Sequence, residues 1–296
     1  MSLRGVIPPL VTPFQADGAL DLASFQANLE SLSAFDLAGF LVLGSNGEAA
    51  SLEEEEKLAL VAAARRGVAR DRLLLVGTGM ESTRATIALG RRVADLGADA
   101  VLVLTPHYYK PRMTPDALRR HFEAVADASP VPVYLYSVPA FTGLTWPAGL
   151  AQALAGHPRI AGMKESSGDV GLLSRVVASV PASFRVACGN ALAFYPSLCV
   201  GAAAGVLAVA NCAPRPAIAL LRAFEAGDHA RARRIQEALA PLAAAVTAGH
   251  GVAGLKETMS MIGLRGGTVR APLLPAPASV RDELRPLLEA AAAAAA

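Results

Sequence analysis

Eight short apolar runs, each rich in β-branched residues, alternate along this chain with longer stretches of helical periodicity. The apolar runs are Val6 to Thr12, Phe40 to Gly44, Leu73 to Gly77, Ala100 to Thr105, Val133 to Ser137, Ile160 to Lys164, Phe184 to Ala187 and Gly205 to Ala210. The amphipathic stretches are Asp21 to Ala34, Glu53 to Arg66, Thr83 to Leu96, Pro115 to Ala128 and Val170 to Val180. This alternation predicts repeated βα units and a parallel sheet covered by helices.

Eight βα units are the number that closes a (β/α)8 TIM barrel, and an open doubly wound sheet is the alternative. Polar residues and glycines recur just after or near the ends of the strands at fairly even intervals, which favours the barrel. They are Ser45, Gly79, Tyr108, Tyr136, Lys164, Gly189 and Asn211. In a barrel such positions share the C-terminal rim, where catalytic residues collect from several strands.

After Asn211 the pattern becomes purely helical. Helices are predicted over Pro216 to Ala226, Asp228 to Thr247, Val252 to Ile262 and Arg281 to Ala296. We therefore expect a barrel over residues 1–226 and a helical extension over residues 227–296. Near the second strand, Ser51 precedes Glu54 by three residues, which predicts a capping box there. The acidic run Glu53 to Glu56 then suits the positive end of the helix dipole and is expected to be solvated.

Composition excludes several classes of protein. A net charge of +2 without basic runs argues against a nucleic-acid surface, and the chain has no apolar stretch of membrane-spanning length. Three cysteines, Cys188, Cys199 and Cys212, show neither a disulfide framework nor metal-ligand spacing. The first residues lack the features of a secretory signal, so a cytoplasmic protein is expected.

The chain has four lysines: Lys57, Lys110, Lys164 and Lys256. Only Lys164 lies at the end of an apolar run, where burial disfavours the charged amine and leaves a neutral one able to form a Schiff base. Taken alone, the segment favours the simpler interpretation that the ammonium reaches water or pairs with Glu165. Lys256 is interpreted as a lysine at a helix surface or at the edge of the core.

Four segments near the predicted rim form a set. They are Gly44-Ser45-Asn46-Gly47-Glu48, Thr105-Pro106 with Tyr108-Tyr109, Leu135-Tyr136-Ser137-Val138-Pro139 and Gly162-Met163-Lys164-Glu165-Ser166. In order and spacing they resemble the pyruvate-dependent class I lyases of the dihydrodipicolinate synthase and N-acetylneuraminate lyase superfamily, over nearly the whole chain. The resemblance implies an eight-stranded barrel with a helical appendage, a homotetramer, and catalysis without metal or organic cofactor. It also favours a catalytic role for Lys164 over the simpler interpretation.

The resemblance implies roles for individual residues. Lys164 matches the Schiff-base lysine, and Tyr136 matches the phenol that moves protons at the imine. Ser45 matches a hydroxyl that relays protons to Tyr136, and Tyr108 matches a tyrosine contributed by a neighbouring subunit, with Tyr109 as the rival choice. A strand tyrosine is also commonly a packed aromatic, and Ser45 and Asn46 also suit an ordinary turn.

Substrate-binding positions complete the prediction. The amides of Ser45 and Asn46 are expected to hold the carboxylate of a 2-oxo acid, because successive turn amides attract an anion. Gly189 and Val209 align with pocket positions of the superfamily. Ser166 either assists the site or caps a helix that begins near Gly168.

The deviations from the superfamily concern the second substrate. Phe141 stands where the synthases have an arginine that binds a carboxylate, and Ala187 to Ala191 lacks the acidic pair of sialic acid lyases. The motifs most resemble the 4-hydroxy-2-oxoglutarate aldolase branch. We therefore expect an aldolase that cleaves a 4-hydroxy-2-oxo acid to pyruvate and, in the simplest case, glyoxylate. A dihydrodipicolinate synthase without that arginine is the alternative, followed by a catalytically silent 2-oxo acid sensor.

Overall fold

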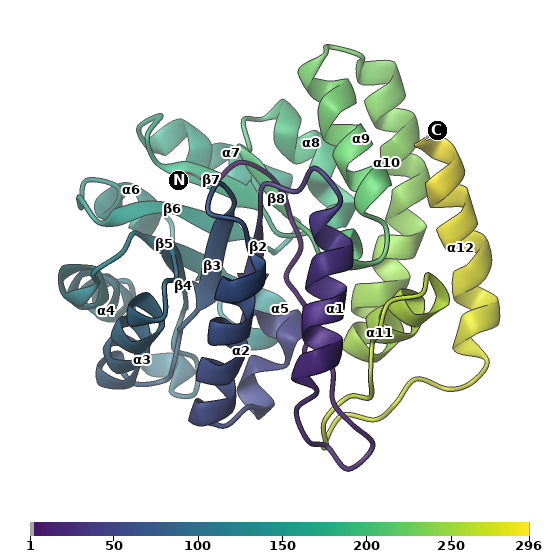
Figure 1. Cartoon of the computed structure of the whole chain (residues 1–296). Coiled ribbons are helices and arrows are strands. Elements are labelled where there is room, and N and C mark those ends of the chain that lie inside the picture. The colour runs from purple at the N-terminus through teal and green to yellow at the C-terminus, as the bar shows by residue number, and fades with distance from the viewer. Residues whose placement is uncertain (1–2, 296) are drawn as a thin grey trace.

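The computed structural model describes residues 3–295, and eight parallel strands form its centre (Figure 1). The strands are β1 (Gly5–Ile7), β2 (Gly39–Val42), β3 (Leu73–Gly77), β4 (Ala100–Leu104), β5 (Val133–Ser137), β6 (Ile160–Glu165), β7 (Arg185–Cys188) and β8 (Ala204–Val206). They pair in the order β1-β8-β7-β6-β5-β4-β3-β2. A bridge between Pro9 and Leu41 brings the two ends of this order together, so the sheet is a nearly closed barrel, as predicted.

Helices surround the strands and continue beyond them (Figure 1). They are α1 (Leu22–Ser33), α2 (Glu54–Gly67), α3 (Thr83–Asp95), α4 (Pro115–Ala128), α5 (Pro139–Thr142), α6 (Leu150–Leu154), α7 (Val170–Ser179), α8 (Phe194–Cys199), α9 (Pro214–Glu225), α10 (His229–Ala244), α11 (Gly251–Met261) and α12 (Val280–Ala294). The expected boundary at residues 226 and 227 falls in the turn between α9 and α10. Helix α10 packs on α8, α9 and α12, so the helical extension lies directly against the barrel. Ala296, included in the predicted last helix, lies outside the described residues.

Two predicted strands, the first and the last, are shorter in the structure by three or more residues. Strand β1 stops at Ile7 because Pro8 and Pro9 have no N–H to donate to a ladder. Strand β8 stops at Val206, and residues Ala208–Asn211 form a 3-10 turn instead. Helices α5, α6 and α8 were not predicted, because segments of four to six residues are too short to show a helical period.

The predicted capping box of α2 was wrong in register. The N-cap is Glu53, and its N–H donates to the Glu56 carboxylate at 2.9 Å. Ser51 belongs to the 3-10 turn Ala49–Ser51, after which the chain is extended at Leu52 before the helix begins. Of the acidic run, Glu54 and Glu55 are exposed as expected, whereas Glu56 forms an ion pair with Arg270.

The interior of the barrel is filled by one cluster of side chains from alternate strand positions. Its members include Ile7, Leu41, Leu75, Leu102, Tyr134, Tyr136 and Val206. The hydroxyl of Tyr134 accepts a hydrogen bond from the Leu3 N–H at 3.2 Å. Tyr136 lies two residues further along β5, on the same side of the strand and nearer its C-terminal end. Both tyrosines therefore point into the barrel, Tyr134 at the level of Leu3 and Tyr136 nearer the rim.

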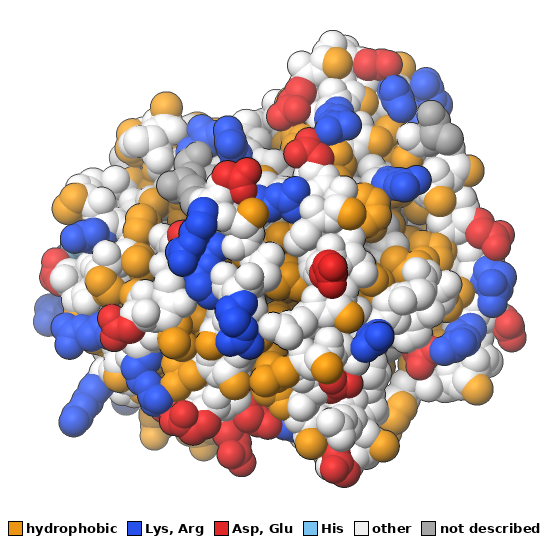
Figure 2. Space-filling view, in the orientation of Figure 1, with side chains coloured by type: hydrophobic (Ala, Val, Ile, Leu, Met, Phe, Trp, Pro, Cys, Tyr) orange, Lys and Arg blue, Asp and Glu red, His pale blue; other side chains and the backbone are white. Residues whose placement is uncertain are grey.

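The surface of the molecule carries charges of both signs. On the face drawn in Figure 2, acidic and basic side chains are interspersed, with apolar side chains visible between them. Nucleic-acid binders present a clustered basic face instead. Among residues 3–295, no helix combines the length and the apolar character needed to cross a membrane.

Candidate active site

Lys164 and Tyr136 lie side by side on neighbouring strands. They are register partners in the β5–β6 ladder, and the Lys164 Nζ donates a hydrogen bond to the Tyr136 Oη at 3.2 Å. Only 4% of Lys164 is exposed, and its Nζ lies 4.3 Å from the centre of the Tyr136 ring. Glu165 follows on the opposite face of β6 and accepts a hydrogen bond from the Ser167 N–H. The partner of the Lys164 ammonium is therefore the phenol, not the adjacent carboxylate.

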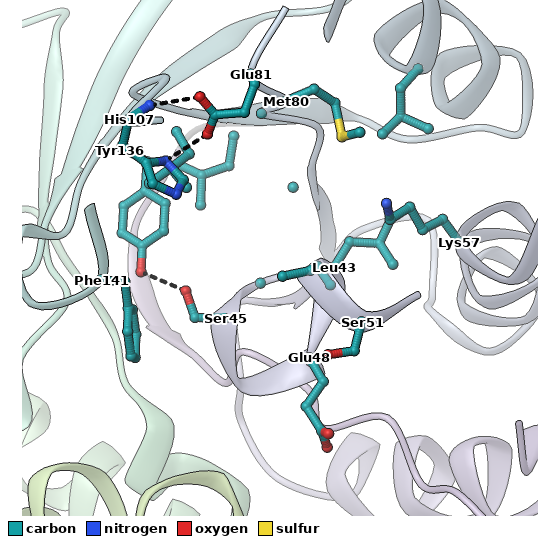
Figure 3. A pocket seen from close by; sticks show the side chains of 18 of the residues that line it. Leu43, Ser45, Glu48, Ser51, Lys57, Met80, Glu81, His107, Tyr136 and Phe141 are labelled. Carbon is teal, nitrogen blue, oxygen red and sulfur yellow. Dashed lines mark hydrogen bonds and ion pairs between the residues drawn. The ribbon is translucent and has the colours of Figure 1, made fainter. Parts of the chain in front are cut away.

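Ser45 is the third member of this group. Its Oγ lies 3.5 Å from the Tyr136 Oη, and Figure 3 shows the two side chains pointing toward each other. Burial tends to raise the pKa of Tyr136, but the charge of Lys164 and the hydrogen bonds from Ser45 and Lys164 outweigh it, so the pKa lies below its ordinary value. Ser166 contributes least to this lowering of the Tyr136 pKa, and its Oγ makes no hydrogen bond in the described residues. An amine, a phenol and a hydroxyl thus form one chain able to move protons.

The turn that carries Ser45 has unusual backbone geometry. Residues Ser45–Gly47 form a 3-10 turn after β2, and Asn46 is half-buried within it. Leu43 before the turn and Glu48 after it have φ of 59° and 52°, the left-handed region that non-glycine residues rarely adopt. Strain of this kind persists only where surrounding contacts fix the backbone, and it clusters at functional sites.

Gly189 lies directly against the lysine. A Cβ at this position would lie 1.8 Å from the Ser166 Oγ and 2.8 Å from the Lys164 Cε, so only glycine fits there. The Ser166 Oγ is buried without a hydrogen-bond partner in the described residues, and Asp169, not Ser166, caps α7. The capping interpretation of Ser166 was therefore wrong. Val209 is fully buried, but it is not among the residues that line the cavity described next.

A cavity of about 560 Å³ extends outward from Ser45 and Tyr136. Phe141, on α5, lines it and is 66% exposed, and no arginine is among its lining residues. Lys57, Glu81 and His107 also line it, and the sequence interpretation assigned no role to any of them. Lys57 comes from α2, Glu81 from the segment after β3 and His107 from the segment after β4. Because the three residues are far apart in the sequence, no local motif marks them as neighbours of one cavity. Glu81 and His107 form an ion pair when the imidazole is protonated.

Tyr108 and Tyr109 do not reach this group within the chain. They are 76% and 68% exposed, and their rings meet edge to face at 5.0 Å. The Glu81 carboxylate accepts hydrogen bonds from the backbone N–H groups of His107 and Tyr108, which joins this segment to the loop between β3 and α3. With one chain present, the role of Tyr108 in a neighbouring subunit stays a prediction.

The interpretation of Lys256 as a surface or core-edge lysine was wrong. Lys256 lies on α11 with only 1% exposed, and its Nζ donates to the Glu48 carboxylate at 2.5 Å and to the Thr268 carbonyl at 2.6 Å. Burial lowers the pKa of Lys256, and Glu48 opposes this effect. Lys57 is also buried and makes no ion pair among residues 3–295. The prediction that Lys164 is the one poorly solvated lysine was therefore wrong. Its hydrogen bond to the Tyr136 phenol still distinguishes Lys164 from the other two buried lysines.

The three cysteines are free, and Cys188 and Cys212 are buried. Among residues 3–295, no group of three His, Cys, Asp or Glu side chains has an arrangement that could hold a metal ion. The chemistry available from the grouped side chains is that of an amine beside a phenol and a hydroxyl. Such a group can form an imine with a carbonyl compound and move the protons that this requires.

Comparisons with known proteins agree with this chemistry. The family model described as the Dihydrodipicolinate synthetase family matches residues 2–291. The 4-hydroxy-tetrahydrodipicolinate synthase of Methanoculleus marisnigri is 35% identical over 288 residues, which are 96% of this chain and 98% of that protein. The 4-hydroxy-tetrahydrodipicolinate synthase 1 of Streptomyces coelicolor is 37% identical over 266 residues, 89% of this chain and 86% of that protein.

Solved structures give the same result. The chloride-inhibited dihydrodipicolinate synthase of Acinetobacter baumannii, complexed with pyruvate, matches with a TM-score of 0.93 and 30% identity. The match covers 98% of this chain and 99% of that one. The sequence and the fold therefore match over nearly the whole chain. The chain therefore belongs to the dihydrodipicolinate synthetase family, whose members are lyase-type enzymes that form a Schiff base with pyruvate.

Proposed function

We propose that this enzyme is a class I aldolase that cleaves a 4-hydroxy-2-oxo acid, in the simplest case 4-hydroxy-2-oxoglutarate to pyruvate and glyoxylate. The observation that carries the choice of substrate is Phe141 at the cavity, with no arginine among the residues that line it. A second substrate bearing a carboxylate and an amino group would meet an aromatic ring there instead of a guanidinium.

In this proposal Lys164 attacks the 2-oxo carbon and forms an imine after loss of water. The imine accepts the electron pair of the C3–C4 bond as that bond breaks, while the 4-hydroxyl proton leaves and the aldehyde is released. The resulting enamine takes a proton at C3, and hydrolysis of the imine releases pyruvate. Tyr136, whose pKa is lowered by its contacts with Lys164 and Ser45, is the group placed to carry protons in both directions.

The remaining predicted residues hold the substrate. The turn amides of Ser45 and Asn46 bind the carboxylate, and the unpartnered Ser166 Oγ offers a further polar contact beside Lys164. Tyr108 of a neighbouring subunit completes the proton relay, which makes a dimer the smallest active unit and a homotetramer the expected assembly. The exposed Tyr108 side chain supports this arrangement.

The second candidate is a 4-hydroxy-tetrahydrodipicolinate synthase, and the names of the relatives favour it. The same enamine would then attack the aldehyde of aspartate semialdehyde, and some other basic group would bind its carboxylate. Arg215 is unsuited, because it lies over Phe35 and lines a different groove. Arg112, in the exposed 3-10 turn Lys110–Arg112, is the first arginine to test.

The silent sensor is disfavoured, because a protein that only binds a 2-oxo acid has no need of an amine hydrogen-bonded to a phenol.

Direct comparison of the two reactions tests the proposal. Purified enzyme is assayed for pyruvate release from 4-hydroxy-2-oxoglutarate and related aldols, and for condensation of pyruvate with aspartate semialdehyde. Pyruvate release is expected to be the faster reaction by at least about tenfold in kcat/KM, the scale of one charge-assisted contact. A preference for aspartate semialdehyde would overturn the aldolase assignment and establish the second candidate.

A further inference from the structure

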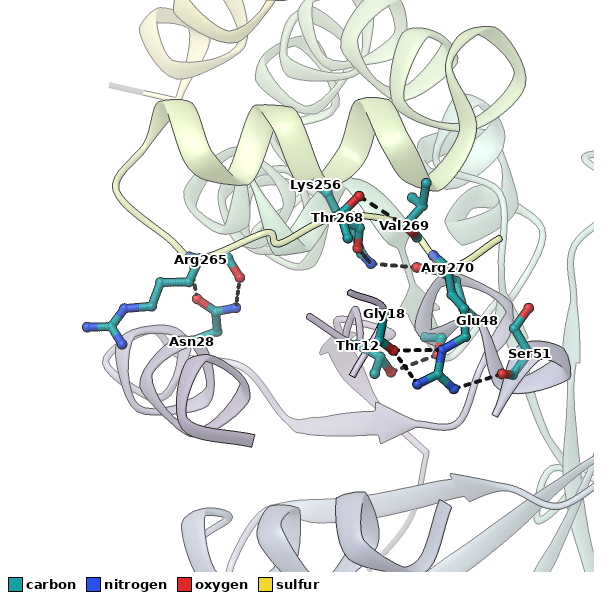
Figure 4. Close-up of polar contacts among 11 residues, drawn as sticks. Thr12, Gly18, Asn28, Glu48, Ser51, Lys256, Arg265, Thr268, Val269 and Arg270 are labelled. Atoms are coloured by element: carbon teal, nitrogen blue, oxygen red, sulfur yellow. Dashed lines mark hydrogen bonds and ion pairs between the residues drawn. The ribbon is translucent and has the colours of Figure 1, made fainter. Parts of the chain in front are cut away.

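The chain after α11 folds back over the loops that follow β1 and β2 (Figure 4). Arg265 exchanges two hydrogen bonds with the Asn28 side chain, and the Thr268 N–H donates to the Phe14 carbonyl. Two residues later, the Arg270 guanidinium binds the carbonyls of Gly18 and Ser51 and the Glu56 carboxylate. We call residues 264–270 the C-terminal strap. These contacts join the helical extension to the same side of the barrel that carries Ser45.

Glu48 is the point at which this strap meets the Ser45 turn. Its carboxylate accepts hydrogen bonds from the Lys256 Nζ at 2.5 Å and from the Arg270 N–H at 2.9 Å. The exposed fractions of the two charged side chains, Lys256 and Glu48, are 2% and 1%. Both acceptor oxygens of Glu48 are therefore occupied by groups that come from the far end of the sequence, and the carboxylate cannot turn away to water.

The backbone of Glu48 in turn fixes the Ser45 turn. The Glu48 N–H donates to the Ser45 carbonyl at 3.1 Å, and Glu48 itself is held at a left-handed φ of 52°. A glutamate gains nothing locally from that conformation, so contacts elsewhere must maintain it. The two hydrogen bonds to its carboxylate are such contacts. A third restraint is the Thr12 Oγ1, which donates to the Gly47 carbonyl at 2.7 Å.

We infer that Lys256 is a positioning residue that acts through Glu48: it holds the Ser45 turn in the conformation that binds pyruvate. The inference rests on the proposed function in one respect, that this turn receives the carboxylate of the 2-oxo acid. Lys256 does not touch the substrate or Lys164. It makes the C-terminal strap part of the active site, because loss of the ion pair frees Glu48 and with it the Ser45 turn.

The test uses the full-length enzyme and follows reductive trapping of pyruvate by borohydride on Lys164. Lys256→Met removes the ammonium with little change in volume, and Glu48→Gln keeps the shape of the other partner. Arg65→Met is the matched control, because Arg65 forms a largely buried ion pair with Asp99 at the other end of α2. For each variant the pyruvate concentration that gives half-maximal trapping is measured at a temperature where circular dichroism shows the native fold.

Lys256→Met and Glu48→Gln are expected to raise that concentration roughly 10- to 100-fold, the effect of displacing a binding group by about 1 Å. Arg65→Met is expected to leave it within about twofold of wild type, although it also destabilises the fold. The double variant Glu48→Gln/Lys256→Met is expected to regain stability without regaining pyruvate affinity, because a neutral pair tolerates burial but no longer fixes the turn.

Equal half-maximal concentrations in wild type and Glu48→Gln, or an equal rise in Arg65→Met, would show that the pair contributes only to stability and would overturn the inference. If Lys256→Met does not fold, Glu48→Gln and the double variant decide. Failure of the proposed function is a separate result, since in that case wild-type enzyme itself would not be trapped by pyruvate at Lys164.

Discussion

The enzyme contains two lysines that are almost completely buried, and their surroundings differ. Lys256, on α11, donates to a carboxylate and to a carbonyl, whereas Lys164, on β6, donates to a phenol beside an open cavity. The first environment holds the Lys256 side chain in place through an ion pair and a second hydrogen bond. The second offers a phenol as the partner, and that phenol lines the cavity. Burial alone therefore does not distinguish the two lysines, whereas the hydrogen-bond partner and the cavity beside that partner do.

The two lysines also serve different parts of the molecule. Lys164 lies within the barrel, next to a residue of the adjacent strand. Lys256 joins the helical extension to a loop more than 200 residues earlier in the chain. In the proposals made above, Lys164 reacts with the substrate and Lys256 holds the loop that the reaction needs. Four predictions, from the largest expected effect to the smallest, test this division.

The largest effect is expected from Lys164. Lys164→Met and Lys164→Arg should reduce turnover by roughly 10⁴-fold or more, because neither side chain can form the imine. Peptide mapping after borohydride reduction with pyruvate should place the wild-type adduct on Lys164 and none on Lys256. An adduct on Lys256 would reverse the assignment of the two lysines.

Lys256→Met should lower the free energy of unfolding by about 3 to 5 kcal/mol, because it leaves the Glu48 carboxylate buried without its counter-ion. Urea denaturation provides the measurement. The double variant with Glu48→Gln should regain most of the lost free energy of unfolding, since the remaining pair carries no charge. If the double variant is as unstable as Lys256→Met, packing and not charge explains the effect.

Tyr136→Phe should lower turnover by roughly 100-fold while reductive trapping of pyruvate is largely retained, because the ring still packs but proton transfer is lost. Tyr134→Phe is the matched control, since its hydroxyl binds the Leu3 N–H away from Lys164. Ultraviolet titration offers a second check. Wild type should contain one phenol that ionises below the ordinary tyrosine pKa of about 10, and Tyr136→Phe should lack it. Turnover near the wild-type value would mean that Ser45 or water transfers the proton.

The smallest effect is expected at Phe141. Phe141→Arg should improve the relative rate with aspartate semialdehyde by about tenfold, because the position is 66% exposed and water screens part of the new ion pair. Leu273→Arg, which adds the same charge at another residue lining the cavity, is the control. Similar gains in both variants would indicate a general electrostatic effect and not a specific carboxylate contact.

The sequence pattern was sufficient for the barrel. Strands β3 and β5 and helix α4 have the predicted bounds, because apolar runs and amphipathic periods reflect preferences of residues within a few positions of each other. The roles predicted for Lys164 and Tyr136 came instead from the resemblance to the lyase superfamily. Each lies in a strand whose register is set by its own alternation, so their proximity follows once β5 and β6 are neighbours.

Other features could not be predicted from local pattern. The capping box of α2 begins at Glu53 instead of Ser51, because the preceding turn ends later than the motif suggested. Lys256 and Glu48 are ion-pair partners far apart in the sequence, and no signal near either residue indicates the other. Phe141 could be predicted as a departure from the synthases, but its exposed position at the cavity depends on the short helix α5.

By itself the sequence determined the βα alternation, and with it the barrel and the strands that bear Lys164 and Tyr136. Only the tertiary structure decided which buried lysine is held by a carboxylate, where the C-terminal strap runs and which side chains line the cavity. The physical reason is the range of the interactions. Periodicity and strand alternation arise between residues close in sequence, whereas Glu48 meets Lys256 and Arg270, 208 and 222 positions away, only after the chain has folded.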